Sequence, residues 1–288
     1  MKRVYVFPGQ GAQRVGMGAR LFERFATEVA VADAILGYSV EALCLGDDGR
    51  LDRTEYTQPA LYVVTALHYL DKLSSDGPPD LVAGHSLGSF TALFAAGAFD
   101  FATGVRLVQR RGQLMAAAEG GGMAAITGIT EGELRDELTA SGSDTIDIAS
   151  INTPIQTVIS GPRADIERAA AHLSRATDAH VNVLRVSGAF HSRYMEDIER
   201  EFLAFLRGFR FGRLRIPVLS NAFAAPYDDA RVAETLAAQI SRPVRWSEIV
   251  CRLLALGDVE FVEVGPGRTL SALVRQVRSQ LRQSAEVA

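Results

Sequence analysis

Cysteine is scarce in this chain: among its 288 residues there are only two, Cys44 and Cys251. They lie far apart, have no spacing typical of metal ligands, and have no histidine neighbour. This argues against a disulfide framework and against a zinc site. We therefore predict a protein that binds no metal and works in a reducing, cytoplasmic compartment.

Long apolar runs and an excess of one charge are also missing. No stretch of about 18 apolar residues occurs, and the first apolar segment, 4–7, ends at Pro8, which makes it too short for a secretion signal. The 30 Lys and Arg residues are scattered and nearly balance the 34 Asp and Glu residues, for a net charge of −4. We expect neither a nucleic-acid nor a membrane partner.

What is present is a core-forming chain with alternating elements. Hydrophobic residues make up 48% of the sequence, enough for one large domain plus a smaller one. Short apolar strands alternate with amphipathic helices over most of the length, which favours an α/β fold with a parallel sheet. The expected strands of this part are 4–7, 81–83, 216–220 and 261–264. We expect a first helix with Leu21, Phe22, Phe25 and Val29 on one face, and further helices over about 57–70 and 101–118. Three more are expected towards the end of the chain: one through Leu236 and Ile240, one after Pro243, and one from Leu270 to Leu281. We expect the final residues, Gln283 to Ala288, to be frayed.

The rhythm changes after the triple glycine 120–122. From there the pattern predicts strand, helix, two strands, helix and strand, an order typical of a ferredoxin-like unit. The expected segments are 123–129, 130–141, 146–160 as two strands, 164–176 and 181–187. We therefore predict a large domain of residues 1–122 and 190–288, interrupted by a small subdomain of residues 123–189.

The sequence Gly84-His85-Ser86-Leu87-Gly88 is the most informative motif. It follows the apolar segment 81–83 and opens the apolar run 90–94, so the order is strand, tight turn, helix. Glycines on both sides let the backbone turn sharply enough to present the serine hydroxyl at the edge of a sheet, and the N–H of Leu87 can then face a developing oxyanion. Ser86 is therefore a candidate nucleophile, and a turn that only happens to contain a serine is the alternative.

A serine nucleophile needs a base, and His191 is the strongest candidate among five histidines. It follows the small residues 187–189 where the chain leaves the predicted subdomain, so that its imidazole could project into a cleft between domains. A loop histidine with structural contacts only is the alternative. His85 adjoins the serine, so its side chain should point away from the hydroxyl while lining the pocket. We assign the others, His68, His172 and His180, to surface or packing positions.

Arg111 is unusual because helical spacing places it on an apolar face, beside Leu107, Val108 and Leu114, whereas Arg110 falls toward the polar side. A guanidinium on an apolar face needs an anion. That anion is either a protein carboxylate in a structural ion pair or the carboxylate of a substrate, which Arg can bind with two parallel hydrogen bonds. Periodicity does not choose between them.

The glycine-rich loop that begins at Gly9 suggests a dinucleotide site only superficially. Gly11 follows at the right spacing, but Arg14 occupies the place of the third glycine, and no phosphate-loop lysine pattern occurs. The functional alternative is that a backbone N–H of this loop provides a second oxyanion donor.

Taken in order along the chain, seven motifs identify a resemblance that covers nearly its whole length. They are Phe7-Pro8-Gly9-Gln10-Gly11-Ala12-Gln13, Gly84-His85-Ser86-Leu87-Gly88, Arg111-Gly112-Gln113-Leu114-Met115, Asn152-Thr153-Pro154-Ile155-Gln156, Gly188-Ala189-Phe190-His191-Ser192, Gln239 with Pro243-Val244-Arg245-Trp246, and Glu263-Val264-Gly265-Pro266-Gly267. The chain resembles the malonyl-CoA:acyl carrier protein transacylases, above all the free-standing, trans-acting acyltransferases of bacterial polyketide synthases. The family implies an α/β-hydrolase-like large domain with an inserted ferredoxin-like subdomain.

The resemblance also implies roles for individual residues. Ser86 would be the nucleophile, His191 its base, and the backbone N–H groups of Gln10 and Leu87 the oxyanion hole. Arg111 would bind the malonyl carboxylate.

Four more residues are grouped with Arg111 as substrate-binding. Gln239 would lie beside the dyad, where the family orients the histidine with backbone carbonyls instead of an acid. Phe190, directly before the histidine, accompanies a preference for malonyl over methylmalonyl. Asn152 and His85 would line the pocket.

The implied substrate is malonyl-CoA and the implied partner is an acyl carrier protein, whose phosphopantetheine thiol receives the malonyl group in polyketide or fatty acid biosynthesis. The resemblance implies no bound cofactor, a monomer, and a ketosynthase or its flanking linker domains as a further partner. Ser89 and Ala12 depart from the family's usual glutamate and serine. A hydrolase that clears carrier proteins is the rival, against which Arg111 counts, and an inactive docking module is a second one.

Overall fold

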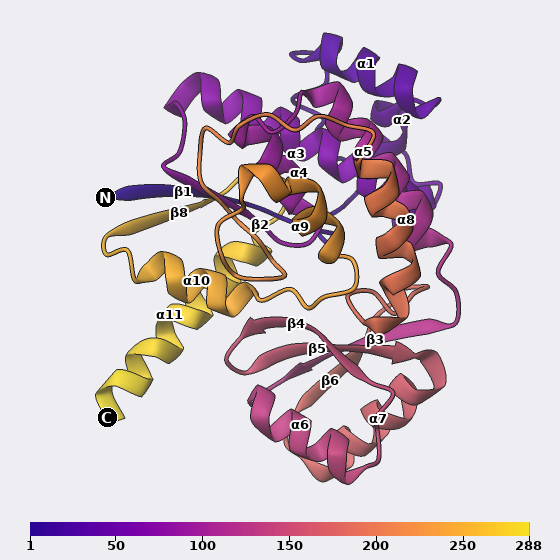
Figure 1. Ribbon diagram of the computed structural model, residues 1–288, viewed down its shortest axis with the longest axis vertical. Coiled ribbons are helices and arrows are strands. Elements are labelled where there is room, and N and C mark those ends of the chain that lie inside the picture. The colour runs from indigo at the N-terminus through magenta and orange to yellow at the C-terminus, as the bar shows by residue number, and fades with distance from the viewer. Residues whose placement is uncertain (288) are drawn as a thin grey trace.

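Four parallel strands form the centre of the larger part of the molecule (Figure 1). β1 (Lys2–Phe7) lies between β2 (Leu81–Gly84) and β8 (Val259–Glu263), and β7 (Val218–Leu219) pairs with the other edge of β2. The side chains from Val4 to Phe7 are fully buried, as expected for a parallel strand covered on both faces. This computed structural model describes residues 1–287, with side chains through Gln283.

Helices surround this sheet on both faces, and together they make up what we call the large lobe. They are α1 (Ala26–Leu36), α2 (Val40–Leu45), α3 (Thr54–Asp76), α4 (Gly88–Ala96), α5 (Phe101–Ala116), α8 (Glu196–Leu206), α9 (Val232–Ala238), α10 (Trp246–Leu254) and α11 (Thr269–Val287), with the 3-10 turns η1 (Arg50–Asp52), η2 (Arg193–Met195) and η3 (Asp229–Arg231). None of the helices within residues 1–287 has the length and hydropathy of a membrane-spanning segment.

Several element boundaries differ from those that the sequence predicts. The helix expected around Leu21 begins only at Ala26, because Gly16 and Gly18 adopt positive φ angles and the chain forms turns up to residue 25. The sequence analysis did not predict α8, although Phe202 and Leu206 form a buried face of this helix.

Two further differences concern the ends of elements. The strand expected over 181–187 ends at Val183. α11 continues helical past Gln283, where we expect frayed residues, and Ala288 lies outside the described residues.

The small lobe is a four-stranded antiparallel sheet with two helices on one face. Its elements are β3 (Gly121–Thr127), α6 (Glu131–Ala140), β4 (Asp147–Thr153), β5 (Gln156–Pro162), α7 (Arg163–Ala176) and β6 (His180–Val183). The strand order β4-β5-β3-β6 confirms the predicted ferredoxin-like arrangement. In Figure 1, α6 and α7 cover the face of this sheet that points away from the large lobe. The domain limits at 123 and 189 stay a prediction.

The lobes are joined by main-chain pairing as well as by side chains. Val244, just before α10, accepts a hydrogen bond from Ile151 N–H at 2.9 Å and donates one to Ala149 O at 2.9 Å. The large lobe therefore adds one residue of extended chain to the edge of β4, and this pairing fixes the position of the small sheet against α10.

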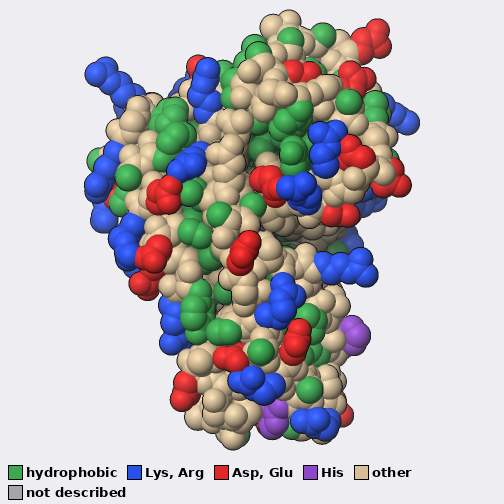
Figure 2. Space-filling view, turned by 90° about the vertical axis from the view of Figure 1, so that its right-hand side faces the viewer, with side chains coloured by type: hydrophobic (Ala, Val, Ile, Leu, Met, Phe, Trp, Pro, Cys, Tyr) green, Lys and Arg blue, Asp and Glu red, His purple; other side chains and the backbone are tan. Residues whose placement is uncertain are grey.

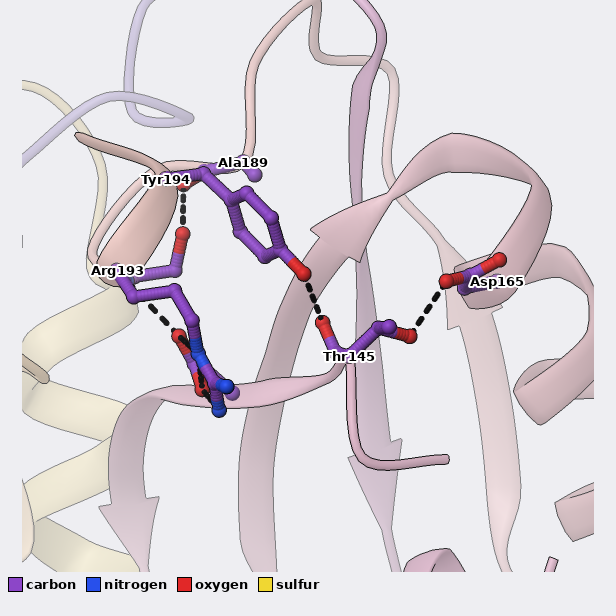
Figure 3. A network of polar contacts seen from close by, with 7 residues as sticks. Thr145, Asp165, Ala189, Arg193 and Tyr194 are labelled. Carbon is purple, nitrogen blue, oxygen red and sulfur yellow. Dashed lines mark hydrogen bonds and ion pairs between the residues drawn. The ribbon is translucent and has the colours of Figure 1, made fainter. Parts of the chain in front are cut away.

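A second set of contacts joins the lobes beside His191 (Figure 3). Arg193 and Tyr194 point toward the small lobe: the Arg193 N–H donates to Asp147 Oδ2 at 2.8 Å, and the Tyr194 hydroxyl donates to Thr145 O at 2.9 Å. Arg193 Nε also lies 2.9 Å from Asp147 Oδ1. The segment that carries His191 is thus attached to the start of β4.

Charged side chains of both signs are interspersed over the face of the molecule seen in Figure 2, where the small lobe lies below the large one. This face has no continuous basic surface of the kind that nucleic acids require.

The turn from β2 into α4 leaves no room for side chains at its two glycines. A Cβ on Gly84 would lie 1.9 Å from the carbonyl carbon of Gly88, and one on Gly88 would lie 2.1 Å from Phe7 O. The first turn of α4 therefore packs directly against the backbone at the end of β1.

We expect Gly88→Ala to destabilise the protein by about 3 kcal/mol or more, because backbone atoms of β1 cannot move aside as a side chain would. For a chain of this size that is a fall of roughly 6–12 °C in melting temperature. Thermal unfolding followed by circular dichroism measures it.

Gly132→Ala is the matched control, since a Cβ there, in α6, would meet only Thr130 Oγ1 at 4.0 Å. It should gain about 0.5–1 kcal/mol from the lower entropy of the unfolded chain. Equal melting temperatures for the two variants would contradict this close packing of the turn from β2 into α4, residues 84–88, which we call the elbow.

Candidate active site

A cavity of about 550 Å³ lies between the two lobes, and Ser86, the predicted nucleophile, is among the residues that line it. Its polar side is formed by the loop 8–12, the elbow residue Ser86 and Arg111 of α5. Its apolar side comes from the small sheet and from α11; these residues include Met123, Ala125, Val158, Leu184, Leu270 and Leu273. A ligand with a charged end and an apolar surrounding fits such a lining.

Ser86 sits on the elbow in a strained conformation. Its φ of +49° lies in the left-handed region, which costs a residue with a side chain about 1–2 kcal/mol. Its N–H donates to Asn221 Oδ1 at 2.6 Å. The turn directs Oγ into the cavity, as the glycine-flanked motif predicts.

His191 is within hydrogen-bond distance of the nucleophile. Its Nε2 lies 2.9 Å from Ser86 Oγ, and its Nδ1 lies 2.7 Å from the carbonyl oxygen of Gln239. Because a carbonyl only accepts, Nδ1 carries the proton, and Nε2 is left with the lone pair that a general base needs. A main-chain carbonyl thus orients the imidazole where many serine enzymes use a carboxylate.

The environment keeps His191 neutral. Burial, followed by the positive charge of Arg111, lowers the pKa of His191 to about 3, although the carbonyl of Gln239 acts in the opposite direction. The imidazole is therefore available as a base across the physiological pH range.

Arg111 is almost completely buried, with 1% of its surface exposed, and it faces the nucleophile. Nη2 lies 3.2 Å from Ser86 Oγ, Nη1 donates to Gln58 Oε1 at 2.8 Å, and the guanidinium lies over the ring of Phe90. Nε has no hydrogen-bond partner, and no carboxylate among residues 1–283, whose side chains are described, pairs with this charge. Burial lowers the pKa of Arg111 to about 9, so it stays protonated at neutral pH.

The alternative of a structural ion pair for Arg111 is therefore not what the structure contains. A buried, uncompensated cation whose fork opens toward Ser86 Oγ is able to bind an anion there. Arg111 from α5, Ser86 from the elbow and His191 from the segment after β6 therefore meet at one place, although they are far apart in the sequence.

The two residues expected to form the oxyanion hole are both near the nucleophile in the fold: Gln10 lines the same cavity as Ser86, and Leu87 follows Ser86 in the chain. Gln10 lines the cavity and its side chain donates to Thr54 Oγ1 at 3.2 Å, while Leu87 is buried at the start of α4. Among residues 1–283, no acceptor is hydrogen-bonded to either main-chain N–H. Both are free to bind a substrate oxygen, and the role itself stays a prediction.

His85 and Asn152 form a polar bridge between the lobes at the cavity wall. His85 Nε2 donates to Asn152 Oδ1 at 2.9 Å, and Ser150 Oγ donates to the same oxygen at 2.6 Å. The imidazole of His85 also lies 5.6 Å from the ring of Trp246. Both residues line the cavity, and the bonding of His85 to Asn152 agrees with a side chain that points away from Ser86 Oγ.

Phe190 lines the cavity directly before the base, but Gln239 does not line it. Gln239 is fully buried, and its side chain donates to Ser89 Oγ at 2.8 Å and to Asn221 Oδ1 at 3.0 Å. The fold directs this side chain into the protein interior, and the Gln239 carbonyl accepts from His191 Nδ1. A substrate-binding role for Gln239 stays a prediction, which the cavity lining does not support.

Two polar residues of this site were missed from the sequence. Gln58, on the buried face of α3, accepts from Arg111, and Asn221, which follows β7, binds the elbow. Gln58 is a polar residue within an apolar helix face, the same signal that identifies Arg111. Asn221 follows the carboxyl end of a strand in a parallel sheet, where functional residues gather.

Comparison with known proteins places the chain. The family described as the acyl transferase domain matches residues 4–288. The polyketide biosynthesis malonyl CoA-acyl carrier protein transacylase BaeC of Bacillus velezensis is 48% identical over 283 residues, which are 97% of this chain and 98% of that protein.

Solved structures agree. Malonyl CoA-acyl carrier protein transacylase from Burkholderia pseudomallei superposes with a TM-score of 0.95 at 48% identity, covering 97% of this chain and 99% of the other. A malonyl-transacylase in complex with a type II polyketide synthase acyl-carrier protein superposes with a TM-score of 0.91 at 33% identity, covering 97% and 94%. With its fold, its elbow and its whole length matched, the chain belongs to the acyl transferase domain family and, within it, to the malonyl-CoA:acyl carrier protein transacylases.

Proposed function

We propose that this protein transfers a malonyl group from malonyl-CoA, through an ester on Ser86, to the phosphopantetheine thiol of an acyl carrier protein in polyketide or fatty acid biosynthesis. The observation that carries the proposal is the buried, unpaired guanidinium of Arg111, 3.2 Å from Ser86 Oγ. A nucleophile beside such a cation selects an acyl group that ends in a carboxylate.

In the first half-reaction Ser86 Oγ attacks the thioester carbonyl carbon while His191 Nε2 takes the hydroxyl proton. The negative charge that develops on the carbonyl oxygen is stabilised by the N–H groups of Gln10 and Leu87. When the tetrahedral intermediate collapses, the carbon–sulfur bond breaks and CoA leaves as the thiol, with the proton that His191 returns. The product is a malonyl ester of Ser86.

The second half-reaction follows the same route in reverse. The carrier's phosphopantetheine thiol gives its proton to His191 and attacks the ester carbonyl. The carbon–oxygen bond then breaks, Ser86 Oγ regains a proton from His191, and the malonyl group leaves on the carrier. Throughout both steps Arg111 holds the malonyl carboxylate, so the acyl group stays oriented while the two thiols exchange.

The substrate carboxylate also acts on the base. The charge of Arg111 lowers the pKa of His191 in the empty site. A carboxylate paired with Arg111 cancels that charge, so the pKa of His191 should rise when malonyl-CoA binds. The imidazole thus becomes a stronger base when a carboxylated substrate is present.

The carrier protein is the proposed macromolecular partner, because one structural relative was solved in complex with such a carrier. The further parts of the proposal are a monomer in the cytoplasm that needs no bound cofactor, and a ketosynthase or its flanking linker domains as a second partner. The preference for malonyl over methylmalonyl rests on Phe190, which lines the cavity beside His191.

We expect Arg111→Ala to slow acylation of Ser86 by malonyl-CoA about 100-fold, since lost hydrogen bonds to a charged group cost up to about 3 kcal/mol. Acylation by acetyl-CoA, which lacks the carboxylate, should change little. Intact mass after short incubations with competing malonyl-CoA, acetyl-CoA and methylmalonyl-CoA measures both, and carrier protein is added afterwards.

The matched control is Arg110→Ala, the neighbouring arginine, which is partly exposed and paired with Glu201. It should behave like the wild type, and Ser86→Ala should carry no adduct. If Arg111→Ala slowed acylation by malonyl-CoA and by acetyl-CoA equally, Arg111 would have no role in selecting the carboxylated acyl group. A wild-type adduct that is released to water and never reaches the carrier would favour the hydrolase.

We expect kcat/KM for acylation to be flat between pH 5.5 and 8, since His191 is neutral in the free enzyme well above a pKa of about 3. The positive charge of Arg111 lowers the pKa of His191, so this pKa should be higher in Arg111→Ala. On acidification, kcat/KM of this variant should therefore begin to fall at a higher pH than kcat/KM of the wild type. Stopped-flow acylation across this range is the measurement. A wild-type rate that rises with a midpoint near pH 6.5 would show that the base is not held neutral.

A further inference from the structure

Asn221 binds the catalytic elbow on both sides of His85. Its side chain is fully buried after the end of β7. Nδ2 donates to Gly84 O at 2.7 Å, and Oδ1 accepts from Ser86 N–H at 2.6 Å. One amide thus closes the turn that holds the nucleophile, from outside the turn.

The elbow depends on this contact because of its backbone conformation. The hydrogen bonds at the start of α4 begin with Gly88 and Ser89 as donors, to His85 O and Ser86 O. The N–H of Ser86 therefore lies outside the helix, and Asn221 is its acceptor. Since Ser86 has a φ of +49°, which side chains disfavour, an external bond at this N–H is what holds the turn in place.

The same amide is linked to the base. Gln239 Nε2 donates to Asn221 Oδ1 at 3.0 Å, and the Gln239 carbonyl accepts from His191 Nδ1 at 2.7 Å. Three hydrogen bonds therefore connect the Ser86 N–H, through Asn221 Oδ1 and then through the side chain and carbonyl of Gln239, to His191. They join the two members of the dyad behind the cavity, on the side away from substrate.

We propose that Asn221 is a positioning residue that fixes Ser86 Oγ relative to His191 Nε2. It is absent from the cavity lining, so it acts through Ser86 and Gln239 and not on the acyl group. The inference rests on the proposed catalytic role of the Ser86–His191 pair, and it adds a residue that serves both half-reactions because both use the same pair.

The test measures Ser86 reactivity in a way that needs neither malonyl-CoA nor a carrier. A fluorophosphonate probe reacts with the serine oxygen and releases fluoride, so its labelling rate reports the nucleophile, the base and the oxyanion donors without either substrate. We compare wild type, Asn221→Ala and Asn221→Asp in labelling, in acylation by malonyl-CoA, and in melting temperature. Affinity for malonyl-CoA is measured by calorimetry on the Ser86→Ala background.

We expect Asn221→Ala to slow both labelling and acylation about 100-fold, the effect of displacing a reacting group by about 1 Å. Affinity for malonyl-CoA should stay within about threefold, because Arg111 and the cavity walls are untouched. Tyr69→Phe is the control: it removes a buried hydrogen bond to Ala95 O at the far end of α4 and should keep wild-type rates.

Asn221→Asp provides the conservative rescue if the alanine variant does not fold. At pH 5.5 a buried carboxyl is neutral, so one oxygen can accept from Ser86 N–H while the hydroxyl donates to Gly84 O. Labelling should then lie within about tenfold of wild type at the same pH.

Two results would overturn the inference. One is a folded Asn221→Ala variant whose labelling rate lies within threefold of wild type. The other is a folded Asn221→Asp variant whose labelling rate at pH 5.5 is about 100-fold below wild type, the value expected for Asn221→Ala. Failure of the proposed function is separate. A wild type that labels fast but takes no malonyl group would refute the transferase, while a slow Asn221→Ala in the same assay would still support the role of Asn221.

Discussion

The uncompensated charge of Arg111 is the constraint on which the arrangement of this site depends. A buried guanidinium without a carboxylate is costly, and the fold tolerates it only with partial substitutes: the amide oxygen of Gln58, the hydroxyl of Ser86 and the face of Phe90. These come from α3, the elbow and α4, so the packing of three segments is adjusted around one cation. In the proposed function, an acyl carboxylate supplies the negative charge that these neutral partners lack.

The same charge sets the chemistry of the base. It adds to burial in keeping His191 neutral, and the carbonyl of Gln239 fixes the tautomer so that the lone pair faces Ser86. In the proposed mechanism Ser86 and His191 need no acid, because a carboxylate of the protein in this cavity would compete with the substrate for Arg111. The position of His191 in turn depends on both lobes, since Arg193 and Tyr194 attach its segment to the small lobe while residues 239 and 240 hold it from the large one.

The sequence allowed the element order of the small lobe, the elbow and the anomaly of Arg111 to be predicted, because each is a local pattern: a change of period, glycines at fixed spacing, a charge on an apolar face. It did not predict the turns over residues 16–25, where two glycines with positive φ prevent an apolar segment from becoming a helix. It also missed Asn221 and did not predict the direction of the Gln239 side chain. Their hydrogen bonds join segments more than 100 residues apart or depend on the direction of a buried side chain, and neither has a local signature.

The most direct measurement is a crystal structure of the malonyl ester on Ser86, formed by the wild type with malonyl-CoA in the absence of a carrier protein. We expect a carboxylate oxygen about 2.7–2.9 Å from the Arg111 nitrogens, as in charge-assisted pairs, with Gln58 still bonded to Nη1. A malonyl carboxylate that points to solvent or to the small lobe, with Arg111 bonded only to Gln58, would contradict the central role assigned to this cation.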